Sequence, residues 1–527
     1  MVYEEYLDKV KDMIKDLKAM CAGLGLANTG DEYKIISELF TYKFLNDKLQ
    51  REYERNKDEY ESYDDFVDFV GDDFARIYTK CTIDTMYHLQ SEDNFNTLLD
   101  NALIKISEWN SDIYSIETAS GNKKPLFEPL AAYIRDEDKE MELAKRSINI
   151  LADTQYKFDK VYDEGWDYFS SIFEFLIKDY NKDSGKYAEY FTPVSAGNIM
   201  AEILYNDTPT EKVTIYDPAA GSGTLLLCMA NVIGSKNCML YSQDISQKSS
   251  QFLRMNMILN RLSNSLNNVI EGNTMTNPYH KNGDNLKKFD FIVSNPPFNM
   301  DFSADVETLK NDKYDRFFAG IPNGDIKEKE KMAIYQVFLQ HIIASLNEKG
   351  KAAVVVPNGF ITAQKGIPLR IRKKLVDKNW LRGIITMPQN IFATTGTKVS
   401  LLFIDKTKTD DGIFIMDASD MGTKTKVDDI QRTILSSEEI KMIIECFKDK
   451  KSLKDFCALV SREDIKNKNY FLSLGTYIKA KKEVVEYSVD EFNKNMEIYT
   501  NELKKCYKRG AILEQKIIDT LEAIKYE

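Results

Sequence analysis

One tetrapeptide combines residue types suited to chemistry on an aromatic amine. Asn295-Pro296-Pro297-Phe298 directly follows an apolar run over residues 289–294. Two consecutive prolines remove two backbone donors and fix φ, so the segment is rigid and cannot continue a strand or a helix. The side-chain oxygen of Asn295 and the carbonyl oxygen of Pro296 can accept both hydrogens of an amino group, and Phe298 can stack on the ring that carries it. Such acceptors draw the amine nitrogen toward sp³ character and expose its lone pair to an electrophilic methyl group, with no strong base. The tetrapeptide therefore predicts a site for amine methylation; a loop without chemistry is the alternative.

A glycine turn upstream has the pattern of a nucleotide-type pocket. The segment from Asp217 to Gly223 reads DPAAGSG and joins an apolar run to an apolar helix. A strand, a glycine turn and a helix N-terminus leave room for a ligand. No Gly-Lys-Ser/Thr follows, which disfavours ATP hydrolysis. Asp244 ends the next run, where a carboxylate can hold ribose hydroxyls. A plain tight turn and a solvated acid are the alternatives, and the spacing favours a cofactor.

The elements that must position these residues alternate between strands and helices. Because near-continuous apolar runs suit strands covered on both faces, they predict an α/β fold with a mostly parallel sheet that binds ligands at its carboxyl edge. Ten of the twelve prolines lie between Pro193 and Pro388, which indicates helical flanks around this centre. Seven candidate strands cover residues 213–217, 239–243, 268–272, 289–294, 352–357, 383–387 and 399–404. We expect a helical N-terminal domain at 1–165, the sheet domain at 166–410, a connecting segment at 411–485 and a C-terminal helix at 486–527.

These motifs resemble the gamma-type amino-methyltransferases of DNA, and specifically the modification (methyltransferase) subunit of Type I restriction-modification systems. The resemblance covers residues 160–410 well and the helical N-terminal flank more loosely. It rests on GKYAEYFTP (185–193), DPAAGSGTLL, NPPF and two downstream segments at 337–360 and 387–406. It implies a seven-stranded Rossmann-like methyltransferase sheet, S-adenosylmethionine as the cofactor and the N6 amine of a flipped adenine in double-stranded DNA as the acceptor.

The resemblance also implies roles for individual residues. The segment 185–193 would close over the methionine part of the cofactor, and Phe392 would form the other face of a sandwich around the base with Phe298; a core aromatic is the alternative for Phe392. The chain departs from the family at Asn273, where an acidic residue is usual, and at Asp244, where Glu is common. The expected cofactor-binding residues are Tyr190, Thr192, Pro193, Asp217, Ala219, Gly221, Gly223, Asp244 and Asn273.

The net charge and the C-terminal apolar pattern indicate that this chain recognises DNA together with a partner protein. The net charge of −12 has the wrong sign for gripping phosphates over the whole surface. A basic stretch at 364–375 could touch phosphates through Arg370, Arg372, Lys373 and Lys374, although a solvated helix face is favoured. Apolar residues three and four apart from Val489 to Ile524 predict a helical seam that docks on a partner. By resemblance, two copies of this chain join one DNA-specificity subunit, and a restriction (motor-nuclease) subunit is a further potential partner.

Other function classes find little support. The chain has no signal-like start and no apolar run long enough to span a bilayer, so we expect a cytoplasmic protein with no membrane partner. Seven cysteines without a Cys-x-x-Cys pair and three distant histidines predict no metal site. Two alternatives stay open: the same chemistry on another acceptor (cytosine N4, an RNA base or a protein glutamine), and a catalytically silent scaffold, which the intact NPPF and GSG disfavour.

Overall fold

The computed structural model divides the chain into two compact units, Met1–Ile478 and Lys479–Glu527. Neither unit contains, among the residues described, a helix long and apolar enough to cross a membrane. The described residues are 2–27, 30–71, 74–118, 123–134, 136–157, 192–205, 212–323, 329–392, 398–427, 430–478 and 488–523.

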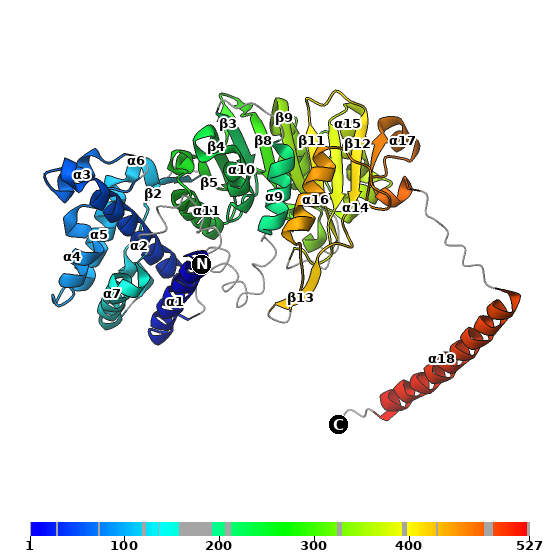
Figure 1. The fold of residues 1–527 in the computed structure, drawn as a ribbon, viewed down its shortest axis with the longest axis horizontal. Coiled ribbons are helices and arrows are strands. Elements are labelled where there is room, and N and C mark those ends of the chain that lie inside the picture. The colour runs from blue at the N-terminus through cyan, green and yellow to red at the C-terminus, as the bar shows by residue number, and fades with distance from the viewer. Residues whose placement is uncertain are drawn as a thin grey trace. The chain divides into compact units, whose positions relative to one another are not determined.

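Helices dominate the N-terminal part of the first unit. α2 is buried around its whole circumference over residues 39–49, since Ile36, Leu39, Phe40 and Leu45 lie on different sides of the helix and all are in the core. The blue and cyan helices lie together beside the β5 side of the sheet (Figure 1). They are α1 (Val2–Gly23), α2 (Gly30–Asn56), α3 (Tyr63–Phe69), α4 (Ile83–His88), α5 (Phe95–Trp109), α6 (Ser111–Tyr114) and α7 (Glu137–Ala152).

A large mixed sheet forms the centre of the same unit. All seven predicted strands are present as β3 (Val213–Asp217), β4 (Cys238–Asp244), β5 (Val269–Glu271), β8 (Phe289–Ser294), β9 (Leu346–Pro357), β10 (Leu381–Thr386) and β11 (Val399–Asp405). The strand order is β15-β12-β10-β11-β9-β8-β3-β4-β5-β1-β2. The six strands from β1 to β9 in this order run parallel, and β11 lies antiparallel between β9 and β10. The predicted α/β class with a mostly parallel sheet is confirmed.

The predicted count of seven strands is too low, because the sheet has eleven. β1 (Ile116–Thr118) and β2 (Lys123–Lys124) extend one side from within the helical region. β12 (Gly412–Asp417) and β15 (Cys457–Ser461) extend the other side, so the sheet continues beyond residue 410. β12 carries a buried apolar run over residues 413–416 that sequence reasoning passed over, whereas β1, β2 and β15 are short or only partly apolar and become strands through tertiary pairing.

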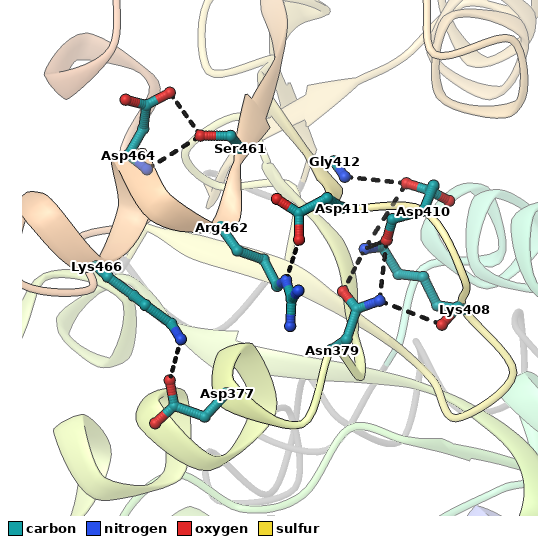
Figure 2. A network of polar contacts seen from close by, with 10 residues as sticks. All are labelled: Asp377, Asn379, Lys408, Asp410, Asp411, Gly412, Ser461, Arg462, Asp464 and Lys466. Carbon is teal, nitrogen blue, oxygen red and sulfur yellow. Dashed lines mark hydrogen bonds and ion pairs between the residues drawn. The ribbon is translucent and has the colours of Figure 1, made fainter.

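Polar contacts fasten the β12–β15 side of the sheet (Figure 2). Lys466 Nζ lies 3.0 Å from Asp377 Oδ1, which ties α17 (Arg462–Asn467) to α15 (Gly366–Asp377). Arg462 pairs with Asp411, the residue just before β12. These groups are partly exposed, so each pair contributes little alone, and their value is to fix register at the end of the sheet.

Helices cover both faces of the sheet and give it three layers (Figure 1). One face packs with α9 (Val194–Leu204), α10 (Thr224–Ile233), α11 (Gln247–Leu259) and α16 (Ser437–Lys448). The other face packs with α13 (Tyr335–Ser345), α14 (Asn358–Thr362), α15 and α17. A smaller core at the end of α13 joins Phe302, Val306 and Leu309, around α12 (Val306–Lys310), to Val337 and Phe338. Two hairpins, β6–β7 (Lys281–Asn282, Asn285–Leu286) and β13–β14 (Thr423–Val427, Ile430–Ile434), stand apart from the sheet.

The second unit is described as one helix, α18 (Val489–Ala523). It runs through Gly510 without interruption, and a Cβ at Gly510 would meet nothing within 4 Å. Its apolar residues are exposed, among them Phe492 at 53%, Leu503 at 59% and Ile517 at 61%. Ile524, the last residue of the predicted seam, lies outside the described residues.

Candidate active site

The residues predicted to do chemistry meet at the carboxyl ends of four adjacent parallel strands. The order β5-β4-β3-β8 places Asp244 at the end of β4, Asp217 at the end of β3 and Ser294 at the end of β8. In register, Ile215 pairs with Phe291 and Asp217 with Ser242. Parallel strands in this order bring segments 77 residues apart within contact, as a hydrogen bond of 2.8 Å from Ser294 Oγ to Asp217 Oδ1 demonstrates.

The glycine turn after β3 needs glycine at two positions. Gly221 and Gly223 have φ values of 52° and 87°, in the left-handed region that side chains rarely adopt. A Cβ on Gly223 would also lie 2.1 Å from Leu253 Cδ1 of α11. The turn is therefore packed tightly from behind, and α10 begins directly after it at Thr224.

Two carboxylates frame this turn. Asp217 Oδ1 accepts from Ala219 N at 3.0 Å and from the Ser294 hydroxyl, and Asp244 Oδ2 accepts from Gly221 N at 2.8 Å. Burial raises the pKa of Asp217 to about 7, although its two donors act against the shift. Burial also raises the pKa of Asp244. Buried carboxylates with raised pKa values are typical of sites that await a polar or cationic ligand.

The tetrapeptide after β8 is held in one orientation. Asn295 Nδ2 donates to Thr192 Oγ1 at 3.1 Å, and Thr192 lies directly before α9 with Pro193 as the N-cap residue. This bond directs the amide nitrogen toward Thr192 and so presents the amide oxygen elsewhere. The half-buried ring of Phe298 meets Tyr335 of α13 edge to face, with centroids 6.4 Å apart. Phe298 thus lies between the cores on the two faces of the sheet, with part of its surface accessible.

Three of the predicted site residues differ from the others in how far the described structure supports a contact with a ligand. Tyr190 lies outside the described residues. Phe392 is 6% exposed and packs in the core that covers the α9–α10 face, so it offers little of its ring to a ligand in this conformation. Asn273 Oδ1 accepts from Met275 N at 2.9 Å and caps the turn after β5, so the oxygen expected to face the cofactor already has one backbone partner.

Sequence reasoning passed over three residues at this site. Ser294, at the end of β8, joins the segment before the tetrapeptide to the glycine turn through its hydrogen bond to Asp217. Ile245 follows Asp244 and is 62% exposed, an unusual apolar surface at a strand end. Asn256 of α11 donates from Nδ2 to Ser222 O at 2.9 Å and supports the glycine turn from beneath. Only Ile245 carried a signal, since an apolar residue beside a candidate ribose carboxylate can cover an aromatic base.

The basic stretch over residues 364–375 is mostly structural. Arg372 is fully buried, and its guanidinium donates to the carbonyl oxygens of Phe360, Ala363 and Tyr470. Arg372 is therefore unavailable to a phosphate. Within the described ranges, no group of three or more His, Cys, Asp or Glu is arranged to hold a metal ion.

Comparisons with known proteins agree with this geometry. The model of the family "N-6 DNA Methylase" matches residues 164–486. The Type I restriction enzyme MpnII methylase subunit of Mycoplasma pneumoniae is 31% identical over 371 residues, which cover 68% of this chain and 65% of that protein, just under two thirds of its length. The MjaVIII methylase subunit of Methanocaldococcus jannaschii is 25% identical over 486 residues, which cover 89% of this chain and 79% of the relative.

A solved structure shares the fold. The type I restriction-modification methyltransferase subunit of Streptococcus thermophilus superposes with a TM-score of 0.69 at 20% identity, over 89% of this chain and 99% of that one. The family model alone spans more than half of the 527 residues. The chain therefore belongs to the N-6 DNA methylase family.

Proposed function

We propose that this chain transfers a methyl group from S-adenosylmethionine to the N6 amine of an adenine flipped out of double-stranded DNA. The observation that carries the proposal is the orientation of Asn295 by Thr192 beside the loops of Asp217 and Asp244. Family membership supports the acceptor, since the matching family is that of N-6 DNA methylases.

The residues around the glycine turn fit S-adenosylmethionine by their chemistry. Asp244 offers a carboxylate for the ribose hydroxyls, and exposed Ile245 offers an apolar surface for the adenine ring. Asp217, Ala219, Gly221 and Gly223 form the turn, and the two glycines adopt the left-handed backbone that lets it bend tightly. Asn273 and Pro193 complete the proposed wall, together with Tyr190. When bound, the cofactor supplies an electrophilic methyl group on sulfur.

On the acceptor side, the chain's own groups orient the amine. Asn295 Oδ1 and the Pro296 carbonyl oxygen accept its two hydrogens, which leaves the nitrogen lone pair directed at the methyl group. Phe298 stacks on the base and offsets part of the few kcal/mol that flipping costs. Phe392 would join as the second face only after its buried ring turns outward. After methyl transfer the nitrogen would carry a positive charge and lose its extra proton to water, so no residue need act as a strong base.

The exposed apolar side chains of α18 support the proposal that this helix binds a partner protein. Its exposed apolar side chains recur along one side of the helix, and a contiguous exposed apolar stripe is typical of an interaction surface. We propose that the helices of a DNA-specificity subunit cover this stripe, and that two copies of the chain join one such subunit. The open space around Gly510 would allow a partner helix to approach closely. A restriction subunit would be a further component.

The decisive experiment compares wild type with Asn295→Ala, each purified with the proposed DNA-specificity subunit. Methylation of a duplex is followed by sequencing that detects N6-methyladenine, and binding of S-adenosylmethionine is measured by calorimetry. We expect Asn295→Ala to lose on the order of 10² or more in rate, as for one preorganised contact, while it still binds cofactor. Methylation of cytosine N4, RNA or protein instead of adenine would replace the acceptor. A normal rate in the variant would remove the mechanism.

A further inference from the structure

A fully buried arginine lies between the proposed cofactor wall and the segment that follows the catalytic tetrapeptide. Arg316 is 2% exposed and belongs to the stretch that connects Phe298 to α13. Its Nη1 donates to Thr274 O at 3.2 Å, and its Nη2 donates to Met275 O at 2.6 Å. Both carbonyls belong to the turn after β5 that begins at Asn273.

Four N–H groups of Arg316 donate to oxygen atoms, and the fifth faces a histidine ring nitrogen. Besides the two carbonyls, Nε and Nη2 donate to Asp312 Oδ1 at 2.9 and 2.7 Å, and Nη1 lies 3.3 Å from His341 Nδ1. The guanidinium also stacks on Phe317, 4.6 Å from its ring centroid. Lysine has three donors on one atom and could not reproduce this planar set.

The contacts of Thr274 extend this connection to the glycine turn. Thr274 Oγ1 donates to Pro218 O at 2.7 Å, so one residue links the β5 turn to the DPAAGSG segment. Asn273 Oδ1 in turn accepts from Met275 N, so the arginine holds the backbone that orients Asn273. Hydrogen bonds thus run from Pro218 in the glycine turn through Thr274 in the β5 turn to Arg316 in the stretch after Phe298.

A buried ion pair is a poor way to gain stability alone. The free energy of desolvating both Arg316 and Asp312 opposes their attraction, and apolar side chains of similar volume often stabilise a core equally well. Such a pair does fix geometry, because every donor has a single place to go. That argues for a role in positioning.

We infer that Arg316 is a positioning residue that holds residues 273–275 at the distance from the catalytic segment that S-adenosylmethionine requires. The inference rests on the proposed function for the identity of the ligand. Arg316 would contact neither the cofactor nor the base; it would position the cofactor wall through its hydrogen bonds to the carbonyl oxygens of Thr274 and Met275.

Arg370, at an exposed position, provides a control for the anchoring of the same connecting stretch. It donates from Nε to Ala319 O at 2.8 Å, so it holds the same connecting stretch from α15 without touching the β5 turn. If the stretch merely needs anchoring, Arg316→Lys and Arg370→Lys should behave alike. If Arg316 positions the cofactor wall, only its replacement should matter for cofactor.

The test measures S-adenosylmethionine binding by calorimetry and amide hydrogen exchange without ligand, on the full chain as wild type, Arg316→Lys and Arg370→Lys. We expect Arg316→Lys to lose about tenfold or more in affinity, as for the loss of hydrogen bonds to a charged group, and Arg370→Lys to change by less than about twofold. Exchange at residues 273–276 should rise only in Arg316→Lys.

Equal affinities and equal exchange in the two variants would overturn the inference. Arg316→Gln, which is neutral and keeps one planar amide, serves as the second variant; unfolding of both Arg316 variants would assign the residue to stability and also overturn it. If the wild type binds no S-adenosylmethionine, the proposed function fails, whereas exchange at 273–276 still tests the role of Arg316.

Discussion

The side-chain amide of Asn295 donates from Nδ2 to the hydroxyl oxygen of Thr192 across 3.1 Å. This contact joins the residue proposed to bind the target amine with one that sequence reasoning placed on the cofactor. It predicts that Thr192→Val frees the amide to rotate and lowers kcat for methyl transfer by about tenfold, as expected for a lost hydrogen bond. Thr192→Ser keeps the acceptor and should restore the rate. Steady-state kinetics with both variants decide, and a change in KM for the cofactor with kcat unaltered would assign Thr192 to cofactor binding alone.

Replacing Asp244 should lower the affinity for S-adenosylmethionine more than replacing Asn295 does. Its carboxylate lies at the end of β4 and accepts from Gly221 N, so removing it takes away both a proposed ribose ligand and a support of the glycine turn. We expect Asp244→Ala to weaken S-adenosylmethionine binding by about tenfold or more, and Asn295→Ala to leave it nearly unchanged. Calorimetry on the three proteins makes the comparison. Equal affinity of wild type and Asp244→Ala would withdraw the ribose assignment.

The buried carboxyl of Asp217 predicts a pH dependence of stability. Its pKa rises from 3.8 to about 7 on folding because of burial, so the folded chain binds this proton more tightly than the unfolded chain. The resulting stabilisation is complete below about pH 4 and is lost as pH rises through 7, by a few kcal/mol. Asp217→Asn should flatten this part of the curve of unfolding free energy against pH. Denaturant unfolding between pH 4 and 9 measures it.

Glu38 offers a matched control for Asp217. Burial raises its pKa from 4.5 to about 8, and it lies on α2. Glu38→Gln should also flatten the pH dependence, over a window that reaches one pH unit higher, yet leave cofactor affinity unchanged. Asp217→Asn should reduce that affinity. A pH profile of unfolding that neither substitution alters would contradict both assignments.

The exposed stripe of α18 predicts loss of assembly without loss of the sheet. Leu503 and Leu513 are 59% and 52% exposed, so aspartate at either position should cost the first unit nothing. Leu503→Asp should abolish co-purification with the specificity subunit, while Lys508→Asp, on the opposite side of the helix, should retain it. Truncation from about residue 485 should behave as Leu503→Asp does. Unchanged pull-down by the truncated chain would place the docking surface elsewhere.

Local pattern was enough to predict the family and the central strands. The membership of the N-6 DNA methylase family predicted from NPPF, DPAAGSG and their order is confirmed by the match over residues 164–486. The seven strands could be predicted because a strand buried on both faces must be apolar almost throughout. The tight turn at Gly221 and Gly223 could be predicted because glycine readily adopts the left-handed backbone found there. The close packing of Leu253 behind Gly223 explains why this position has no room for a side chain.

Contacts between distant segments were beyond the reach of local pattern. The bonds of Ser294 to Asp217, Thr192 to Asn295 and Arg316 to Thr274 join residues 77, 103 and 42 positions apart, and no local period encodes such a pairing. The same reason explains the outer strand β15, which becomes a strand through a neighbour supplied by the fold, whereas the buried apolar run of β12 carried a local signal. The sequence by itself determined which chemistry is present and on which strand ends it sits. Only the tertiary structure decided which side chains hold that chemistry in place, because hydrogen-bond partners are chosen by proximity in space and not along the chain.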